Sequence, residues 1–256
     1  MDKNLTELVF ILDRSGSMGG LESDTIGGFN SLLEKQKKVE GKCNLTTVLF
    51  DHDYELLHDR INIQAVSPLT EKDYYVRGST ALLDAVGRTI SKIEHVQETT
   101  AEEYRAGKVM FVIITDGMEN ASREYTTKKV KSMIEAEKEK GWKFVFLGAN
   151  MDAVETAAQY GIDADNTADY LADREGTRLN YTAMSDAVAQ FRTCGCAPKE
   201  SLKRIPQKNP RRRCQTRRKE TQSKEVRRRS IAKVFKHHKC TCVSVFFSNI
   251  PARKGL

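Results

Sequence analysis

The chain lacks the features of a secreted or membrane-spanning protein. Its first residues carry no cluster of basic side chains, and the apolar run over residues 8–12 meets Asp13 after only five residues. A signal peptide needs a basic start and a longer apolar core, and a membrane-spanning helix needs about 20 apolar residues. We therefore expect a cytoplasmic protein that makes no contact with a membrane.

Sequence motifs of nucleotide binding and hydrolytic catalysis are also missing. No Gly-x-x-x-x-Gly-Lys-Ser/Thr segment is present, so a phosphate-binding loop of that kind is not supported. His52, His58 and His95 are scattered, and no Ser or Cys lies in a nucleophile elbow beside them. We expect that the protein is not an enzyme.

Cysteine is scarce and acidic residues are unevenly distributed. Cys43 is alone among the first 192 residues and lies in a strand-like run, which favours a core position over a disulfide. Residues 193–256 contain 19 Lys and Arg against three Glu and no Asp, a net charge of +16, whereas residues 1–192 have a net charge of −9. The sequence thus predicts a domain over 1–192 and a basic tail over 193–256.

Three interpretations of the basic tail are open. Its Lys and Arg runs favour a disordered arm that binds nucleic acid or another polyanion. Its cysteines and histidines, beginning with Cys194 and ending with Cys242, offer enough ligands for a zinc site. The absence of Asp, Tyr, Met and Trp from the tail is also what a shifted reading frame would produce.

Apolar periodicity predicts that strands and helices alternate along the domain. The expected strands cover 7–13, 44–50, 54–63, 108–115 and 142–147, and the expected helices cover 21–39, 80–96, 126–141, 153–160 and 181–191. The short connection at 51–53 favours a hairpin, and Ser79 or Thr80 can cap the second helix. This pattern predicts an α/β fold, a three-layer Rossmann-like doubly wound and mostly parallel sheet with one antiparallel edge strand.

Oxygen-bearing side chains gather at three junctions of the predicted fold. Asp13, Ser15 and Ser17 follow the first strand, Thr80 precedes the second helix, and Asp116 follows the strand over 108–115. Such side chains also cap helices and turns, but capping does not explain why all three groups occur together. Because ligands bind at the carboxyl ends of parallel strands, and because hard cations prefer oxygen, the sequence predicts a Mg²⁺ or Mn²⁺ site.

Residues beside these positions have other expected roles. Arg14 is expected to point away from the metal as a charge on the rim, and Met18 is expected to pack. Glu119 and Asn120 either support the ligands or begin a helix.

The three segments, taken in order, resemble the von Willebrand factor type A domain and its metal-ion-dependent adhesion site. They are Asp-x-Ser-x-Ser at 13–17, Gly-x-Thr-x-Leu at 78–82 and Thr-Asp-Gly at 115–117, and the resemblance covers residues 5–192. It implies that Ser15, Ser17 and Thr80 bind the metal through their hydroxyls, with Asp13 and Asp116 bound directly or through water. It also implies an open position that takes an acidic side chain of a partner protein. An intracellular, single-domain member of this kind resembles bacterial or phage forms.

The sequence therefore predicts a Mg²⁺-dependent protein-binding module whose partner presents an acidic residue. One alternative is a nucleic-acid-associated protein that binds through the basic tail. The other is a regulatory or assembly subunit of an ATPase.

Overall fold

The strands form one twisted sheet in the computed structural model, which describes residues 1–195 and 202. The strands are β1 (Asp2–Asp13), β2 (Lys42–Phe50), β3 (Tyr54–Asn62), β4 (Ala106–Thr115), β5 (Lys143–Ala149) and β6 (Thr167–Tyr170). Their order across the sheet is β3-β2-β1-β4-β5-β6. Every neighbouring pair is parallel except β2 and β3, which are antiparallel at one edge. The predicted topology with one antiparallel edge strand is confirmed.

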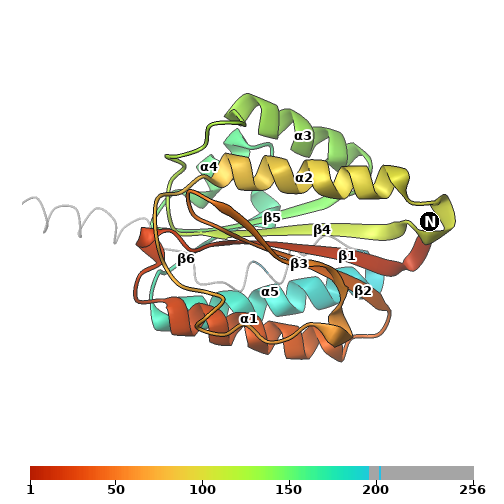
Figure 1. Ribbon diagram of the computed structural model, residues 1–256, viewed down its shortest axis with the longest axis horizontal. Helices are drawn as coiled ribbons and strands as arrows, with labels where there is room; N and C mark the ends of the chain where they lie inside the picture. The colour runs from red at the N-terminus through yellow and green to blue at the C-terminus, as the bar shows by residue number, and fades with distance from the viewer. Residues whose placement is uncertain (196–201, 203–256) are drawn as a thin grey trace, which may run out of the picture. The chain divides into compact units, whose positions relative to one another are not determined.

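Helices cover both faces of this sheet. They are α1 (Glu22–Lys37), α2 (Leu82–Thr99), α3 (Thr127–Glu139), α4 (Ala153–Gln159) and α5 (Arg174–Cys194). Figure 1 shows α1 and α5 on one face and α2, α3 and α4 on the other. Each group of helices closes its own hydrophobic core against the sheet. The expected three-layer α/β architecture is therefore present.

The central strands explain why the sequence has unbroken apolar runs. Along β1, Leu8 and Phe10 pack towards α1 and α5, whereas Val9 and Ile11 pack towards α2 and α3. Because both faces are covered, successive side chains are all buried, as is usual for central parallel strands. Each such side chain contributes about 1.5–3 kcal/mol by burial. This core holds the carboxyl ends of β1 and β4 in fixed positions.

The sequence analysis did not predict β6 or the first turns of α5. β6 is a four-residue strand, too short for a periodic signal. α5 starts at Arg174, earlier than the expected 181, and Asp173 caps it by accepting a hydrogen bond from the Gly176 amide at 2.7 Å. The first turns of α5 bury the polar residues Thr177 and Asn180, so they lack the apolar periodicity on which the prediction depended.

The expected domain boundary at residue 192 falls within the last turn of α5. α5 continues to Cys194, and Gly195 follows it in the left-handed conformation with φ of 69°. Apart from Leu202, which is buried, the rest of the predicted basic tail, including its proposed zinc ligands from residue 196 onwards, lies outside the described residues. Cys43 is buried as expected, and burial raises the pKa of its thiol to about 12. Within the described part of the chain, no helix has the length and apolarity needed to cross a membrane.

Candidate metal site

The five predicted ligands lie where the strand order of the sheet reverses. After β1 the chain returns through α1 to β2 on one side, and after β4 it returns through α3 to β5 on the other side. A crevice at such a switch point is the usual ligand site of an open parallel sheet. Asp13 is the last residue of β1 and Asp116 directly follows β4, so both carboxylates stand at this point.

Three hydroxyl groups face one another beside these carboxylates. The Ser15 Oγ lies 3.1 Å from the Ser17 Oγ and 3.0 Å from the Thr80 Oγ1. We call these three groups the hydroxyl cradle. A Cβ built on Gly117 would lie 2.9 Å from the Ser17 and Thr80 hydroxyl oxygens and 3.6 Å from that of Ser15. The hydrogen of Gly117 therefore leaves open a space that a methyl group would fill.

Asp116 is a buried carboxylate that lacks partners. It is 4% exposed, and neither of its side-chain oxygens has a hydrogen-bond partner. Burial raises its pKa, and a weak attraction to the nearby Ser17 hydroxyl, which does not reach hydrogen-bond geometry, offsets only part of this effect. A buried acceptor that is left unpaired costs about 1–3 kcal/mol, and more when it is charged. Such a group calls for an explanation, and a bound cation supplies one.

Asp13 is a second buried carboxylate, held in place from both sides. Its Oδ1 accepts a hydrogen bond from the Ser15 amide at 2.7 Å, and its Oδ2 accepts one from the Thr115 hydroxyl at 2.5 Å. Burial raises the pKa of Asp13 to about 6, and the negative charge of Asp116 adds to this increase. The two acidic groups are therefore close enough to repel each other.

The site reaches solvent at Ser17. Asp13, Ser15, Thr80 and Asp116 are buried, whereas Ser17 is exposed. Two carboxylates and three neutral hydroxyls form an oxygen-only donor set that suits Mg²⁺ or Mn²⁺. The donor set, the unpaired oxygens of Asp116 and the space beside Gly117 all fit a small cation. The structure thus brings together all five residues that the sequence singled out.

Thr80 is held in the cradle by the segment after β4. Its amide donates to the Asn120 Oδ1 at 2.9 Å, and its carbonyl accepts from the Asn120 amide at 3.0 Å. Glu119 instead caps α2, since its Oε2 accepts from the Leu83 amide at 2.9 Å. The prediction that Ser79 or Thr80 caps α2 is wrong: the N-cap position is Ala81, and the Thr80 hydroxyl bonds to Ser15.

Arg14 is not the rim charge that the sequence predicted. Its side chain is completely buried, and its Nε and Nη1 donate to Asp51 at 3.0 Å and Glu55 at 2.6 Å. Asp51 lies in the turn between β2 and β3 and Glu55 lies in β3, so both partners are remote in sequence. The apolar pattern of β1 gives no sign of this contact. Met18 is buried, in agreement with its predicted packing role.

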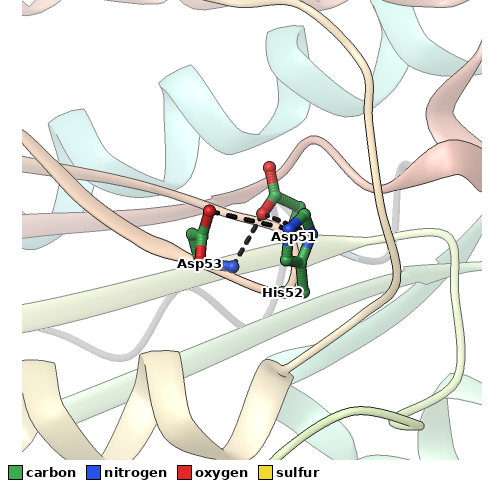
Figure 2. Close-up of side chains that lie close together, drawn as sticks. All are labelled: Asp51, His52 and Asp53. Atoms are coloured by element: carbon green, nitrogen blue, oxygen red, sulfur yellow. Dashed lines mark hydrogen bonds and ion pairs between the residues drawn. The ribbon is translucent and has the colours of Figure 1, made fainter.

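A second group of side chains with metal-ligand atoms lies in the turn between β2 and β3. Figure 2 shows Asp51, His52 and Asp53 together, and one ligand atom from each lies within 4.8 Å of the others. Asp51 is buried, while His52 and Asp53 are exposed. The sequence analysis noted the connection at 51–53 only as a turn, because a three-residue run of this kind has no recognised metal-ligand spacing.

Comparison with solved structures supports the fold. A von Willebrand factor type A protein from Catenulispora acidiphila is 12% identical, with a TM-score of 0.52 over 73% of this chain and 43% of the other. The pilus adhesin SpaC from Lactobacillus rhamnosus GG is 11% identical, with a TM-score of 0.57 over 74% of this chain and 31% of the other. Proximal thread matrix protein 1 from the mussel byssus, with zinc in its metal-ion-dependent adhesion site, is 12% identical, with a TM-score of 0.50 over 72% of this chain and 46% of the other.

The chain thus spans less than half the length of each of these three structures. No protein-family model matches the chain, and no curated protein matches its sequence. At this level of identity the likeness concerns the arrangement of strands and helices. Together with the strand order and the layers described above, it identifies the described part of this chain as a von Willebrand factor type A fold.

Proposed function

We propose that the chain is a Mg²⁺-dependent protein-binding module, with a role in recognition rather than catalysis. Its metal ligands are Asp13, Ser15, Ser17, Thr80 and Asp116, and Mn²⁺ can replace Mg²⁺. The observation that carries this proposal is the space beside Gly117, bordered by three hydroxyls and next to an Asp116 carboxylate without partners. The metal supplies a Lewis-acidic centre that attracts a carboxylate.

The charge and exposure of the ligands favour an acidic partner. Three of the five ligands are neutral hydroxyls, which leave the dication attractive to a further anionic ligand. Ser17 lies on the exposed side of the site, so a Glu or Asp side chain of another protein can approach from there. The buried Asp13 and Asp116 hold the metal from the side of the sheet.

The test uses Mn²⁺ as a paramagnetic probe on the full chain. Water-proton relaxation reports how many water molecules stay on bound Mn²⁺. We expect N-acetylglutamate amide to displace bound water and lower the relaxation enhancement, whereas N-acetylglutamine amide, its neutral isostere, leaves it unchanged. Ser17→Ala should weaken Mn²⁺ binding because it removes an exposed ligand without disturbing the core.

Ser23→Ala is the matched control, because Ser23 is also an exposed serine and lies in α1. Native-like Mn²⁺ binding by Ser17→Ala, or equal responses to the Glu and Gln amides, would contradict the proposal.

The alternative based on the tail predicts a different result. A nucleic-acid-associated protein should lose its binding when the chain is truncated after Gln207, which keeps α5 and the buried Leu202 and removes the Arg runs that begin at residue 211. Metal-dependent capture of an acidic residue should survive the same truncation. An ATPase subunit should bind its ATPase through this same metal-dependent capture, so Ser17→Ala should abolish the association.

A further inference from the structure

Arg14 is a buried cation placed between two predicted metal ligands. Its guanidinium is fully buried, and it pairs with the equally buried Asp51 through Nε at 3.0 Å. Burying two charges is costly unless both are well paired and hydrogen-bonded. The presence of such a pair directly beside the hydroxyl cradle suggests a role in shaping it.

Asp51 also binds the second ligand-bearing loop. Its Oδ2 accepts a hydrogen bond from the Arg77 Nε at 2.7 Å, in addition to the one from Arg14. Arg77 lies three residues before Thr80, and Arg14 lies between Asp13 and Ser15. A single carboxylate oxygen therefore connects the loop that carries the serines to the loop that carries the threonine.

Main-chain hydrogen bonds follow the same route. The Arg77 amide donates to the Arg14 carbonyl at 2.9 Å, and the Ala81 amide donates to the Asp51 carbonyl at 2.7 Å. The Gly16 amide donates to the Gly78 carbonyl at 3.1 Å. Both guanidinium groups also lie over the Tyr75 ring, at 5.4 Å for Arg14 and 5.6 Å for Arg77. The two loops are thus held to each other and to the end of β2.

The surroundings of Asp51 disfavour a metal ion at that position. Its Oδ2 already accepts from two arginines, and its Oδ1 accepts from the Asp53 amide at 2.7 Å. The His52 Nδ1 lies 3.2 Å from the same Oδ1, and Figure 2 shows the two side chains next to each other. A dication at this cluster would displace these donors and stand beside two guanidinium charges, which would repel it.

We propose that Asp51 is a positioning residue that sets the distance between the Ser15 and Thr80 hydroxyls, and thereby makes the cradle selective for Mg²⁺ over Ca²⁺. This inference rests on the proposed function. Mg²⁺ demands near-ideal geometry with short metal–oxygen distances, whereas Ca²⁺ is larger and accepts irregular coordination. Releasing the two loops from Asp51 should therefore cost more Mg²⁺ affinity than Ca²⁺ affinity.

The experiment compares Asp51→Asn with Asp53→Asn in the full chain, by calorimetric titration with Mg²⁺ and with Ca²⁺. Asp53 is the matched control, since it is the same residue type in the same turn and its side chain is 58% exposed. We expect Asp51→Asn to lower Mg²⁺ affinity by about 10-fold or more, as is usual when a supporting partner of metal ligands is lost. Its Ca²⁺ affinity should fall less, and Asp53→Asn should match the native chain.

A second variant covers the case in which Asp51→Asn does not fold. Arg77 is partly exposed, with 38% of its side chain accessible, so Arg77→Lys should preserve the fold. Lys keeps the charge but lacks the planar guanidinium whose Nε donates to the buried Asp51. Arg77→Lys should therefore lower the ratio of Mg²⁺ to Ca²⁺ affinity, as Asp51→Asn does.

Three results would count against these conclusions. A folded Asp51→Asn or Arg77→Lys variant with a native Mg²⁺ to Ca²⁺ ratio would overturn the role of Asp51. Loss of binding in Asp53→Asn and His52→Ala equal to that in Asp51→Asn would place the metal in the 51–53 turn. Absence of Mg²⁺ binding by the native chain would instead overturn the proposed function itself.

Discussion

Replacing Gly117 by Ala should abolish metal binding while leaving the fold in place. The new methyl carbon would lie 2.9 Å from the hydroxyl oxygens of both Ser17 and Thr80, closer than carbon and oxygen normally approach. The methyl group would therefore occupy the space assigned to the cation and push both hydroxyls apart. Overpacking of this kind costs about 1–3 kcal/mol, and we expect the lower end because Ser17 is exposed and can move.

Mass action gives the stabilisation that Mg²⁺ binding should provide. If Mg²⁺ binds the native chain with a dissociation constant of about 0.1 mM, then 1 mM Mg²⁺ adds about 1.4 kcal/mol to the free energy of unfolding. For a domain of this size, that change raises the melting temperature by about 3–5 °C. Gly117→Ala should show no such shift between EDTA and 1 mM Mg²⁺.

Gly27→Ala provides the control for this assay. Gly27 lies within α1, and a Cβ built there would meet no atom within 4 Å. Alanine at an unhindered helical position stabilises by about 0.4–1 kcal/mol, so this variant should melt higher than the native chain and keep its full Mg²⁺ shift. A full Mg²⁺ shift in Gly117→Ala would refute the assignment of the metal to the hydroxyl cradle.

The free energy of unfolding should also depend on Asp13, Arg192 and Glu119. In EDTA, the native chain should lose up to about 3 kcal/mol relative to Asp13→Asn as pH rises from about 4 to 6. The reason is that burial raises the pKa of Asp13 to about 6, so the folded state retains a proton that the unfolded chain releases. If the free energies of unfolding of the native chain and of Asp13→Asn, measured in urea, changed in parallel with pH, the raised pKa of Asp13 would be contradicted. Arg192→Met should lower the free energy of unfolding by about 2–3 kcal/mol, since Arg192 donates to the carbonyls of Gln36, Val39 and Gly41 at the end of α1. Arg192→Lys should recover part of this loss, and equal stability of the Met variant and the native chain would contradict the capping role. Glu119→Ala should cost about 1–2 kcal/mol and speed hydrogen exchange of the Leu83 amide, because it removes the cap of α2. An unchanged exchange rate of the Leu83 amide would count against the capping role of Glu119.

The alternation of strands and helices and the gathering of the candidate ligands at strand ends could be predicted from local patterns. Runs such as residues 108–115 are apolar without interruption because both faces of the sheet are covered, and that signal is strong. The oxygen-bearing side chains follow the ends of β1 and β4, and parallel strands place these ends side by side. The topology alone therefore brings Asp13 close to Asp116.

Contacts between buried polar groups could not be predicted in the same way. Arg14 looks like a surface residue in the sequence, because nothing nearby reveals that Asp51 and Glu55 will surround it. The first turns of α5 were missed because their buried face is polar, at Thr177 and Asn180. The partners of Arg14 come from a distant segment and the buried face of α5 is polar, so local apolar periodicity carries no information about either.

The hydroxyl cradle joins segments that are far apart along the chain. Ser15 and Thr80, whose hydroxyls bond, are 65 positions apart, and Asp13 and Thr115 are 102 positions apart. Local structure in a partly folded chain cannot assemble these groups, because they meet only after β1 has paired with β4. Metal binding therefore requires these long-range contacts and is coupled to folding of the sheet. Bound Mn²⁺ should accordingly report the fully folded population alone and be released in the same cooperative step in which the sheet unfolds.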